Sequence, residues 1–375
     1  MKKIAVSLAL AALFTLSACA PRDGAAPQGA ATPAPTAAPG ETGAAAGDAT
    51  EFGADVTDYT LENATFGGII FEANDVTLTL AGSSTLSGKL KAAGRLTIAG
   101  DGSLAITSGA DDCINAVGDI TIDGGTLILS TEDDAIHSDA GITINGGTVE
   151  IKKSLEGIEA MTVTINGGDV RVSASDDAIN ASDGTDGAPT AQEAPGGRGG
   201  FGGDMINNPA LSVSISGGEV RLYAGADGID SNGSVSITGG TALSFSSSAG
   251  AGGEGPIDAN GATVLAPTLF VSGRTLAAGT VLTVTDADGA EVFGEILSGD
   301  AGSMSLTLPG LLEGETYTVS ADGEQIAEAQ AQTSARGMLQ GGGFDGGDRV
   351  PPDGGWQGGT GAPGRVGQPS PADAA

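Results

Sequence analysis

A unit of about 21–22 residues recurs between residues 96 and 260, and this repeat constrains the fold more than any other feature of the chain. Each unit begins with an apolar–Thr/Ser–Ile triplet, and in five copies a polar residue and two glycines follow it. The isoleucines that close those five triplets are 22, 21, 50 and 22 residues apart: Ile122, Ile144, Ile165, Ile215 and Ile237. The 50-residue gap is one unit plus an insertion of about 28 residues, which we assign to a Gly-rich loop at 183–210.

The second half of each unit is another short strand with apolar–polar alternation, followed by an acidic turn that ends in isoleucine. Such a unit has short strands, glycine turns and no helical periodicity, so it cannot bury a core alone. Stacked coils place equivalent residues above one another at about 4.8 Å and pair the backbones of successive coils. The repeat therefore predicts an all-β chain built on a parallel β-helix. An antiparallel sandwich would show hairpin turns but no recurrence of every position.

The β-helix is expected over 51–262, with seven or eight coils that include weaker copies in 52–95. The period breaks over 263–337. There, strand patterns at 280–285 and 290–293 predict a hairpin, and 303–308 and 316–320 predict further strands. We expect these residues to form a small antiparallel β module that caps the open end of the β-helix, since an uncovered edge strand invites aggregation.

The N-terminus reads as an export signal. Residues 1–19 combine Lys2 and Lys3 with an apolar stretch too short to span a bilayer comfortably, and Leu16–Cys19 fits a bacterial lipobox. We expect Cys19 to carry the lipid that anchors the protein to the extracellular face of the bacterial cell membrane; an ordinary signal peptide with a chance cysteine is the alternative. Residues 20–50 are rich in Ala, Pro, Gly and Thr and predict a disordered tether, and 338–375 predict a Gly/Pro-rich disordered tail.

The composition excludes several classes of function. The chain has 15 Lys and Arg against 47 Asp and Glu, a formal net charge of −32, which argues against binding nucleic acid through its phosphates. Two cysteines exclude a disulfide framework and a Cys-rich zinc site. Aromatic residues make up only 3% of the chain, too few for a broad platform on which sugars stack.

Stacking the repeats turns the acidic turns into a column, which we call the acidic column. The predicted metal ligands occupy three repeat positions. The first position holds Asp112, Asp134, Glu156, Asp177 and Asp227, and the second holds Asn115, His137, Glu159, Asn180 and Asp230. The third position, directly before the first, holds Asp111, Asp133 and Asp176. The weaker last turn adds Asp258 to the second position. Two carboxylates about 5 Å apart repel by about 1 kcal/mol at a dielectric constant of 80 and by about 3 kcal/mol at 20.

A divalent cation would offset this repulsion, and Ca²⁺ suits oxygen ligands on loops of variable spacing better than Mg²⁺ does. Zinc is disfavoured because the chain has one histidine. The alternative is that Asp and Asn simply suit tight turns, which explains one Asp per turn but not the Asp-Asp pairs in three coils. Taken alone, His137 fits a ladder member better than a ligand, and Cys113 fits a buried thiol better than a catalytic one.

The few basic residues also follow the repeat. Arg171 and Arg221 share one repeat position, and Lys152 and Lys153 lie on the equivalent strand of the preceding coil. Alternation along the strand directs both arginines away from the core. We interpret these four residues as a basic strip that contacts the carboxylates of an acidic sugar chain, with solubilising surface charge as the alternative.

Long segments support a family resemblance. DDAIHSDAGITINGGTVEIKKSLEGIEA, INGGDVRVSASDDAINAS and ISGGEVRLYAGADGIDSNGSVSITGG resemble the bacterial carbohydrate-binding β-helix family known from clostridial polygalacturonate- and cellulose-binding surface proteins. TLAAGTVLTVTDADG and LLEGETYTVSADG are similar to that family's closing segment. The resemblance implies a right-handed β-helix related to pectate lyases, Ca²⁺ at the DDAIH, EGIE, DDAIN and ADGID turns, and binding of acidic polysaccharide without established cleavage. Leu155, Ala226 and Pro256 replace acids at turn positions.

Three functions compete on this reading. The first is a monomeric, non-catalytic, calcium-dependent binder of acidic polysaccharide. The second is a polysaccharide lyase in which Ca²⁺ acidifies the proton beside the uronate carboxylate and a Lys or Arg removes it. The third is a structural or adhesive surface rod that Ca²⁺ only stabilises.

Overall fold

The computed structural model describes residues 48–183, 207–247 and 255–334, and these residues form strands and turns with no helix. The all-β prediction is thus confirmed. The signal segment with Cys19, the tether, the tail and most of the predicted insertion lie outside the described residues. Within the described part, no helix long and apolar enough to cross a membrane is found.

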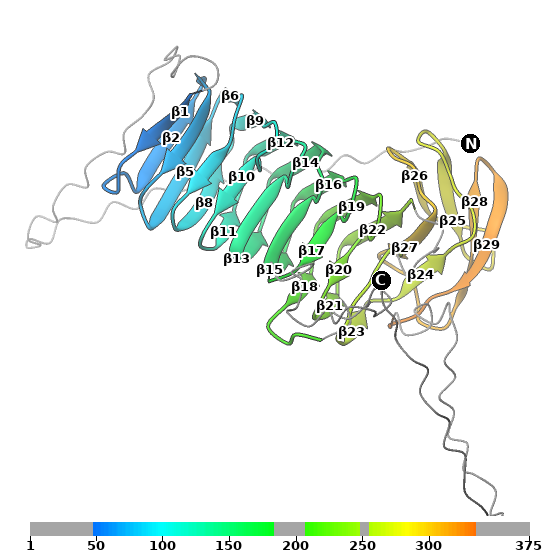
Figure 1. Ribbon diagram of the computed structural model, residues 1–375. Helices are drawn as coiled ribbons and strands as arrows, with labels where there is room; N and C mark the ends of the chain where they lie inside the picture. The colour runs from blue at the N-terminus through cyan, green and yellow to red at the C-terminus, as the bar shows by residue number, and fades with distance from the viewer. Residues whose placement is uncertain (1–47, 184–206, 248–254, 335–375) are drawn as a thin grey trace, which may run out of the picture.

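The chain winds into about eight coils of a parallel β-helix, as the repeat predicts (Figure 1). Each coil contributes to three faces. The first face contains the beginnings of β13 (Ile136–Ile144) and β15 (Ile158–Ile165) together with β1 (Ala49–Phe52), β4 (Gly68–Phe71), β7 (Leu90–Ala92), β10 (Ile114–Ala116), β17 (Ile179–Ala181) and β20 (Asp230–Ser231).

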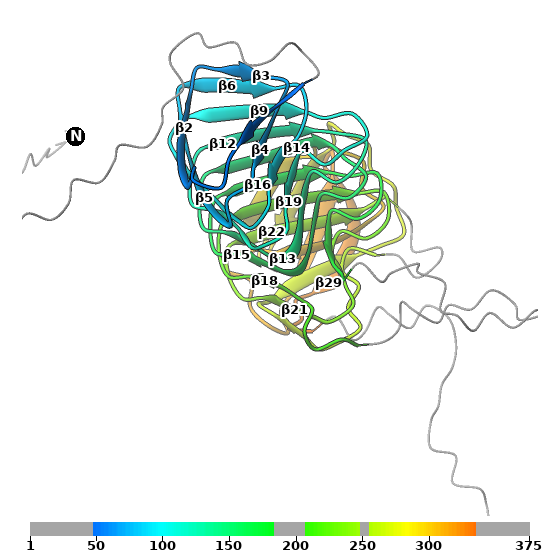
Figure 2. The same cartoon turned by 60° about the vertical axis from the view of Figure 1, so that its left-hand side comes forward.

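The second face contains the ends of β13 and β15 together with β2 (Asp58–Glu62), β5 (Asp75–Ala81), β8 (Arg95–Gly100), β11 (Ile120–Ile122), β18 (Ser212–Ile215), β21 (Ser234–Ile237) and β23 (Thr263–Leu265). The third face contains β3 (Thr65–Phe66), β6 (Ser83–Leu86), β9 (Ser103–Thr107), β12 (Thr126–Ser130), β14 (Thr148–Lys153), β16 (Asp169–Ser173), β19 (Glu219–Ala224) and β22 (Thr241–Ser246). Figure 2 shows the coils lying one behind another along the same path.

The register follows the sequence repeat. Ile122 pairs with Ile144, which pairs with Ile165, and the series continues to Ile215 and Ile237. All five side chains are at most 1% exposed, so each lies on its equivalent in the next coil. Burying an isoleucine stabilises a protein by about 1.5–3 kcal/mol, and the ladder repeats this gain in every coil.

The second glycine of each Gly-Gly turn has two reasons to be glycine. Gly147 and Gly168 adopt φ values of 81° and 90°, which L side chains rarely do. A Cβ at Gly147 would lie 2.6 Å from the Gly125 carbonyl oxygen of the preceding coil. The glycine column therefore sets both the turn and the close approach of successive coils.

The residues after the last coil cover the open end of the β-helix. β27 (Ser303–Thr307) pairs antiparallel with β22 and with β24 (Thr268–Val271), so the sheet of the third face continues into the C-terminal module. A four-stranded antiparallel sheet follows in the order β26 (Glu291–Ile296), β25 (Val281–Thr285), β28 (Thr316–Ala321) and β29 (Glu324–Gln330). Its core joins that of the last coils, where the rings of Tyr223 and Phe245 stack with centroids 4.7 Å apart. The expected small antiparallel β module at the C-terminus is confirmed.

Candidate functional site

The acidic column exists as a line of stacked residues along the first face. Asn115, His137, Glu159, Asn180 and Asp230 are successive register partners on β10, β13, β15, β17 and β20. Asp258 continues the line, because its backbone N–H donates to Ile229 and its carbonyl accepts from Ser231. The second repeat position is therefore continuous over six coil levels.

The turn acids stack beside this line. The residue after each acid donates its backbone N–H to the carbonyl of the next acid: Cys113 to Asp134, Ala135 to Glu156, Gly157 to Asp177, and Ala178 to Asp227. Cys113 is fully buried, as predicted, and burial raises the pKa of its thiol. Its side chain belongs to the core, so the acids line the outer side of these turns.

Three groups of side chains in the column place their ligand atoms within 4.8 Å of one another. We call them the His137 cluster (Asp134, His137 and Glu159), the Asp133 cluster (Asp112, Asp133 and Asp134) and the Asp227 cluster (Asp227, Asp230 and Asp258). The six other predicted ligands lie outside these groups: Asp111, Asn115, Glu156, Asp176, Asp177 and Asn180. Stacking thus concentrates the predicted donors in two regions of the rod, one around Asp134 and one around Asp227.

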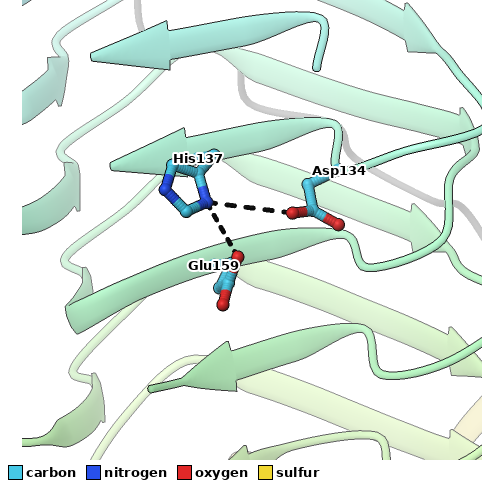
Figure 3. Close-up of side chains that lie close together, drawn as sticks. All are labelled: Asp134, His137 and Glu159. Carbon is cyan, nitrogen blue, oxygen red and sulfur yellow. Dashed lines mark hydrogen bonds and ion pairs between the residues drawn. The ribbon is translucent and has the colours of Figure 1, made fainter. Parts of the chain in front are cut away.

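In the His137 cluster an imidazole lies between carboxylates (Figure 3). Nδ1 of His137 is 2.7 Å from Oε2 of Glu159, a hydrogen bond, and 3.8 Å from Oδ2 of Asp134, an ion-pair distance. Nε2 is 3.1 Å from Asp139. Asp134 and Glu159 raise the pKa of His137 to about 11, so the ring is a cation at neutral pH. A protonated imidazole has no lone pair for a metal ion, and His137 therefore acts as an internal counter-ion.

Burial, with repulsion between neighbouring acids as the smaller cause, raises the pKa of several carboxyl groups in the column. Burial, together with the charges of Glu159 and Asp134, raises the pKa of Glu156 to about 8. Burial also raises the pKa of Asp227 to about 8, and it raises the pKa of Asp112, Asp133 and Asp258 in the same direction. Without a cation, these groups retain protons at a pH where an ordinary carboxyl is ionised.

Asn115 and Lys89 compensate part of the charge near the Asp133 cluster. Nδ2 of Asn115 donates to Oδ2 of Asp112 at 2.7 Å, and Nζ of Lys89 lies 2.9 Å from Oδ1 of Asp111. Asp133 and Asp134 belong to the same turn, so their carboxylates repel each other. This cluster shares Asp134 with His137 and is therefore partly neutralised.

The Asp227 cluster contains only oxygen donors. Asp227 is 9% exposed, and its carboxylate accepts the backbone N–H of Gly255. Asn180, the register neighbour of Asp230, is 6% exposed and donates through Nδ2 to Glu156 at 3.1 Å. The buried Oδ1 of Asn180 makes no hydrogen bond within the described part of the chain. Carboxylates and an unsatisfied amide oxygen are the donors that a hard cation prefers.

The four predicted sugar-binding residues lie on strands of the third face, and all pair with carboxylates. Lys152 lies 3.9 Å from Glu150, Lys153 2.5 Å from Glu132, and Arg171 2.7 Å from Asp169. Arg221 follows Arg171 in register, but its side chain is only 14% exposed because Glu295 of the C-terminal module covers it at 2.5 Å. Arg221 points away from the core as expected, yet it joins the module to the coils instead of extending an open strip.

Sequence reasoning missed the polar rows of the second face. The central residue of each apolar–Thr/Ser–Ile triplet is half-buried and points away from the core, and the row runs Thr77, Thr97, Thr121, Thr143, Thr164, Ser214 and Ser236. The signal was present in the repeat itself, since the hydroxyl recurs at the same position in every copy. The apolar residues of each triplet predict a strand, and the Thr or Ser between them also predicts a row of outward-facing hydroxyl groups.

Comparison with known proteins supports a carbohydrate-binding family, which is the broader part of the resemblance seen in the sequence. Residues 72–188 match a family model described as carbohydrate-binding domain-containing protein. The matched segment runs from β5 to β17 and includes the His137 and Asp133 clusters. No curated protein and no solved structure gives a significant match.

Proposed function

We propose that this protein is a cell-surface lipoprotein that binds acidic polysaccharide through calcium held in the acidic column, without cleaving it. The observation that carries the proposal is the Asp227 cluster, three carboxylates whose oxygen atoms lie within 4.8 Å of one another with no basic side chain among them. The match of residues 72–188 to a carbohydrate-binding family supports the ligand class.

Calcium suits the residues present. Ca²⁺ takes six to eight oxygen ligands at 2.3–2.6 Å and tolerates irregular geometry, whereas zinc favours histidine and cysteine. Asp227, Asp230 and Asp258 would hold the first ion, and Oδ1 of Asn180 lies at the adjacent level. Asp112 and Asp133 would hold a second ion more weakly, because the imidazolium of His137 already neutralises Asp134.

A divalent ion also explains how so acidic a chain can hold a polyanion. The formal net charge of −32 repels a uronate polymer over distances set by the salt concentration. An ion bound to the column and to a uronate carboxylate at the same time converts this repulsion into a bridge. Anchoring at Cys19 would place the rod at the outer surface of the membrane, where such polymers are met.

Affinity electrophoresis in gels containing polygalacturonate tests the proposal. We expect the full chain to be retarded in the presence of Ca²⁺ and to run freely with a chelator. The double variant Asp230→Asn, Asp258→Asn should lose most of the retardation. The matched control is Asp288→Asn, Glu291→Gln, which removes the same charge from the exposed β25–β26 hairpin and should behave as the unaltered chain.

Retardation that persists in excess chelator would contradict calcium bridging. A product that absorbs in the ultraviolet through a new C=C bond would instead support the lyase hypothesis. Each of the four basic residues considered as a base is paired with a carboxylate: Lys152 with Glu150, Lys153 with Glu132, Arg171 with Asp169 and Arg221 with Glu295.

A further inference from the structure

The second face carries a trough that the acidic column does not share. Its cavity has a volume of about 520 Å³ and lies over β2, β5, β8 and β11, which are side by side at the blue-to-cyan end of the rod in Figure 1. The lining is polar except for one valine, and consists of Thr57, Asp58, Asp75, Val76, Thr77, Arg95, Thr97, Asp119 and Thr121. The volume falls within the range of small-molecule sites.

Hydroxyl groups form the floor of this trough. Thr77, Thr97 and Thr121 are register partners on β5, β8 and β11, and Asp58 precedes them in the same row. Their side chains point outward because the residues that flank each threonine in its strand are buried. Each coil thus offers one donor–acceptor group at intervals of about 4.8 Å. An extended pyranose chain advances by a similar distance per sugar.

A second row, two residues earlier in each strand, supplies charge. Nε of Arg95 lies 2.5 Å from Oδ1 of Asp75, and Asp119 follows Arg95 at the next level. Among the described residues, no hydrogen bond or ion pair within 4.0 Å engages the exposed Asp119 side chain, and Asp58 accepts only the hydroxyl of Thr57, at 3.0 Å. The trough therefore holds three carboxylates against one guanidinium, which pairs directly with Asp75 and is also influenced by the charge of Asp119.

We propose that this trough binds a short chain of amino sugars. Because Asp58 and Asp119 lie three strands apart, the protonated amines of two different sugar units would meet the two carboxylates while the hydroxyls of the chain meet the threonine floor. Hydrogen bonds from an ammonium to a carboxylate are roughly twice as strong as neutral ones. The net charge of −32 attracts a cationic glycan to the same surface. The threonine row continues beyond the trough through Thr143 and Thr164, so a longer chain can lie parallel to the rod. This site needs no metal ion and is independent of the calcium proposal.

Isothermal titration of the full chain with glucosamine oligomers, in the presence of a chelator, tests the proposal. N-acetylglucosamine oligomers of the same length serve as the matched ligand, because acetylation removes the positive charge and retains the hydroxyls. We expect the acetylated oligomers to bind at least about tenfold more weakly. The double variant Asp58→Asn, Asp119→Asn should weaken glucosamine binding by a similar factor.

Asp288→Asn, Glu291→Gln is again the control, since it changes the net charge equally at a distance from the trough; we expect less than a twofold effect. Equal binding of the two oligomer series would overturn the proposal, as would unchanged binding by the Asp58, Asp119 variant. Loss of binding in the control variant as well would show attraction to the overall charge only and would also overturn it. Calcium-dependent retardation by polygalacturonate should be the same in the trough variant, so the two proposals fail separately.

Discussion

The His137 and Asp227 clusters occupy the same column of the same rod but neutralise their carboxylates differently. In the first, an imidazolium lies between Asp134 and Glu159 and supplies the positive charge. In the second, all three side chains are acids, and Asp227 carries a pKa raised to about 8. The His137 cluster thus contains its own positive charge, whereas the described side chains of the Asp227 cluster are all acids. The same repeat position therefore carries a cation in one coil and an acid in another, and we propose that only the acidic version binds a metal ion.

The largest expected effect is the change in thermal stability when calcium is removed from the Asp227 cluster. An ion present at about 100 times its Kd stabilises the folded state by about 2.7 kcal/mol. We expect the melting temperature of the full chain to rise with added Ca²⁺ and to fall with a chelator, and the Asp230→Asn, Asp258→Asn variant to lose most of this response. Differential scanning calorimetry measures it. An unaltered calcium response in that variant would place the ion elsewhere.

Replacing His137 should make the first cluster resemble the second. His137→Asn removes the counter-ion but retains a side chain found at the same position in neighbouring coils. Hydrogen bonds to charged groups contribute about 1.5–3 kcal/mol, so we expect the free energy of unfolding to fall by about 2 kcal/mol without calcium. Added Ca²⁺ should restore part of it, because Asp134 and Glu159 then become available as oxygen ligands.

Urea unfolding with and without Ca²⁺ measures both effects. Asp139→Asn is the control, since this exposed residue interacts with Nε2 of His137 at 3.1 Å, and we expect a loss of at most about 0.5 kcal/mol. If His137→Asn gained no calcium response, the imidazolium would not be what distinguishes the clusters.

Without divalent ions, the stability of the folded chain should decrease as pH rises, because buried carboxyl groups hold protons in the folded state. The pKa of Glu156 rises from 4.5 to about 8 and that of Asp227 from 3.8 to about 8, so between these values the folded chain binds more protons than the unfolded chain. Without divalent ions, the free energy of unfolding should therefore fall as pH rises from about 4 to about 8. His137, whose pKa is raised from 6.5 to about 11, lowers the free energy of unfolding in the same direction between those two pH values.

We expect the free energy of unfolding to fall by about 1–2 kcal/mol over this pH range, which corresponds to about one pKa unit once solvent screening is allowed for. Calcium should flatten the profile, since it replaces the protons on the Asp227 cluster. Urea unfolding over this pH range with a chelator gives the profile, and stability that increases with pH would contradict the account.

The smallest expected effect on the free energy of unfolding comes from the Lys89–Asp111 ion pair, which lies at the N-terminal end of the acidic column. Lys89 pairs with Asp111 at 2.9 Å, and the Asp111 side chain is 65% exposed. An exposed ion pair contributes about 0–1 kcal/mol, so Lys89→Gln should lower the free energy of unfolding by at most about 0.5 kcal/mol. Calcium titration of this variant should match that of the unaltered chain. A large change in either quantity would mean that the column extends further toward the N-terminus than the three clusters.

The stacking of the acids could be predicted from the sequence, and the state of their charges could not. Successive coils repeat the same triplet and glycine turn, so the register of Ile122 on Ile144 follows from spacing alone. The pairing of His137 with Glu159 needs the orientation of a ring, which repeat arithmetic does not give. The same limit applies to Oδ1 of Asn180, whose lack of a partner depends on which neighbours bury it.

Arg221 shows a second limit. Alternation along its strand correctly directs the side chain away from the core. The residue that covers it, Glu295, belongs to the C-terminal module, where the repeat has ended and no periodicity relates the two segments. Contacts between the coils and the module were therefore beyond a reading based on the repeat.

The most direct test is diffraction from crystals of the full chain grown with Ca²⁺, with an anomalous difference map. The account predicts a peak within about 2.3–2.6 Å of carboxylate oxygens from Asp227, Asp230 and Asp258. It also predicts none between His137 and Glu159. A map without a peak at the Asp227 cluster, or with an ion at the His137 cluster instead, would contradict it.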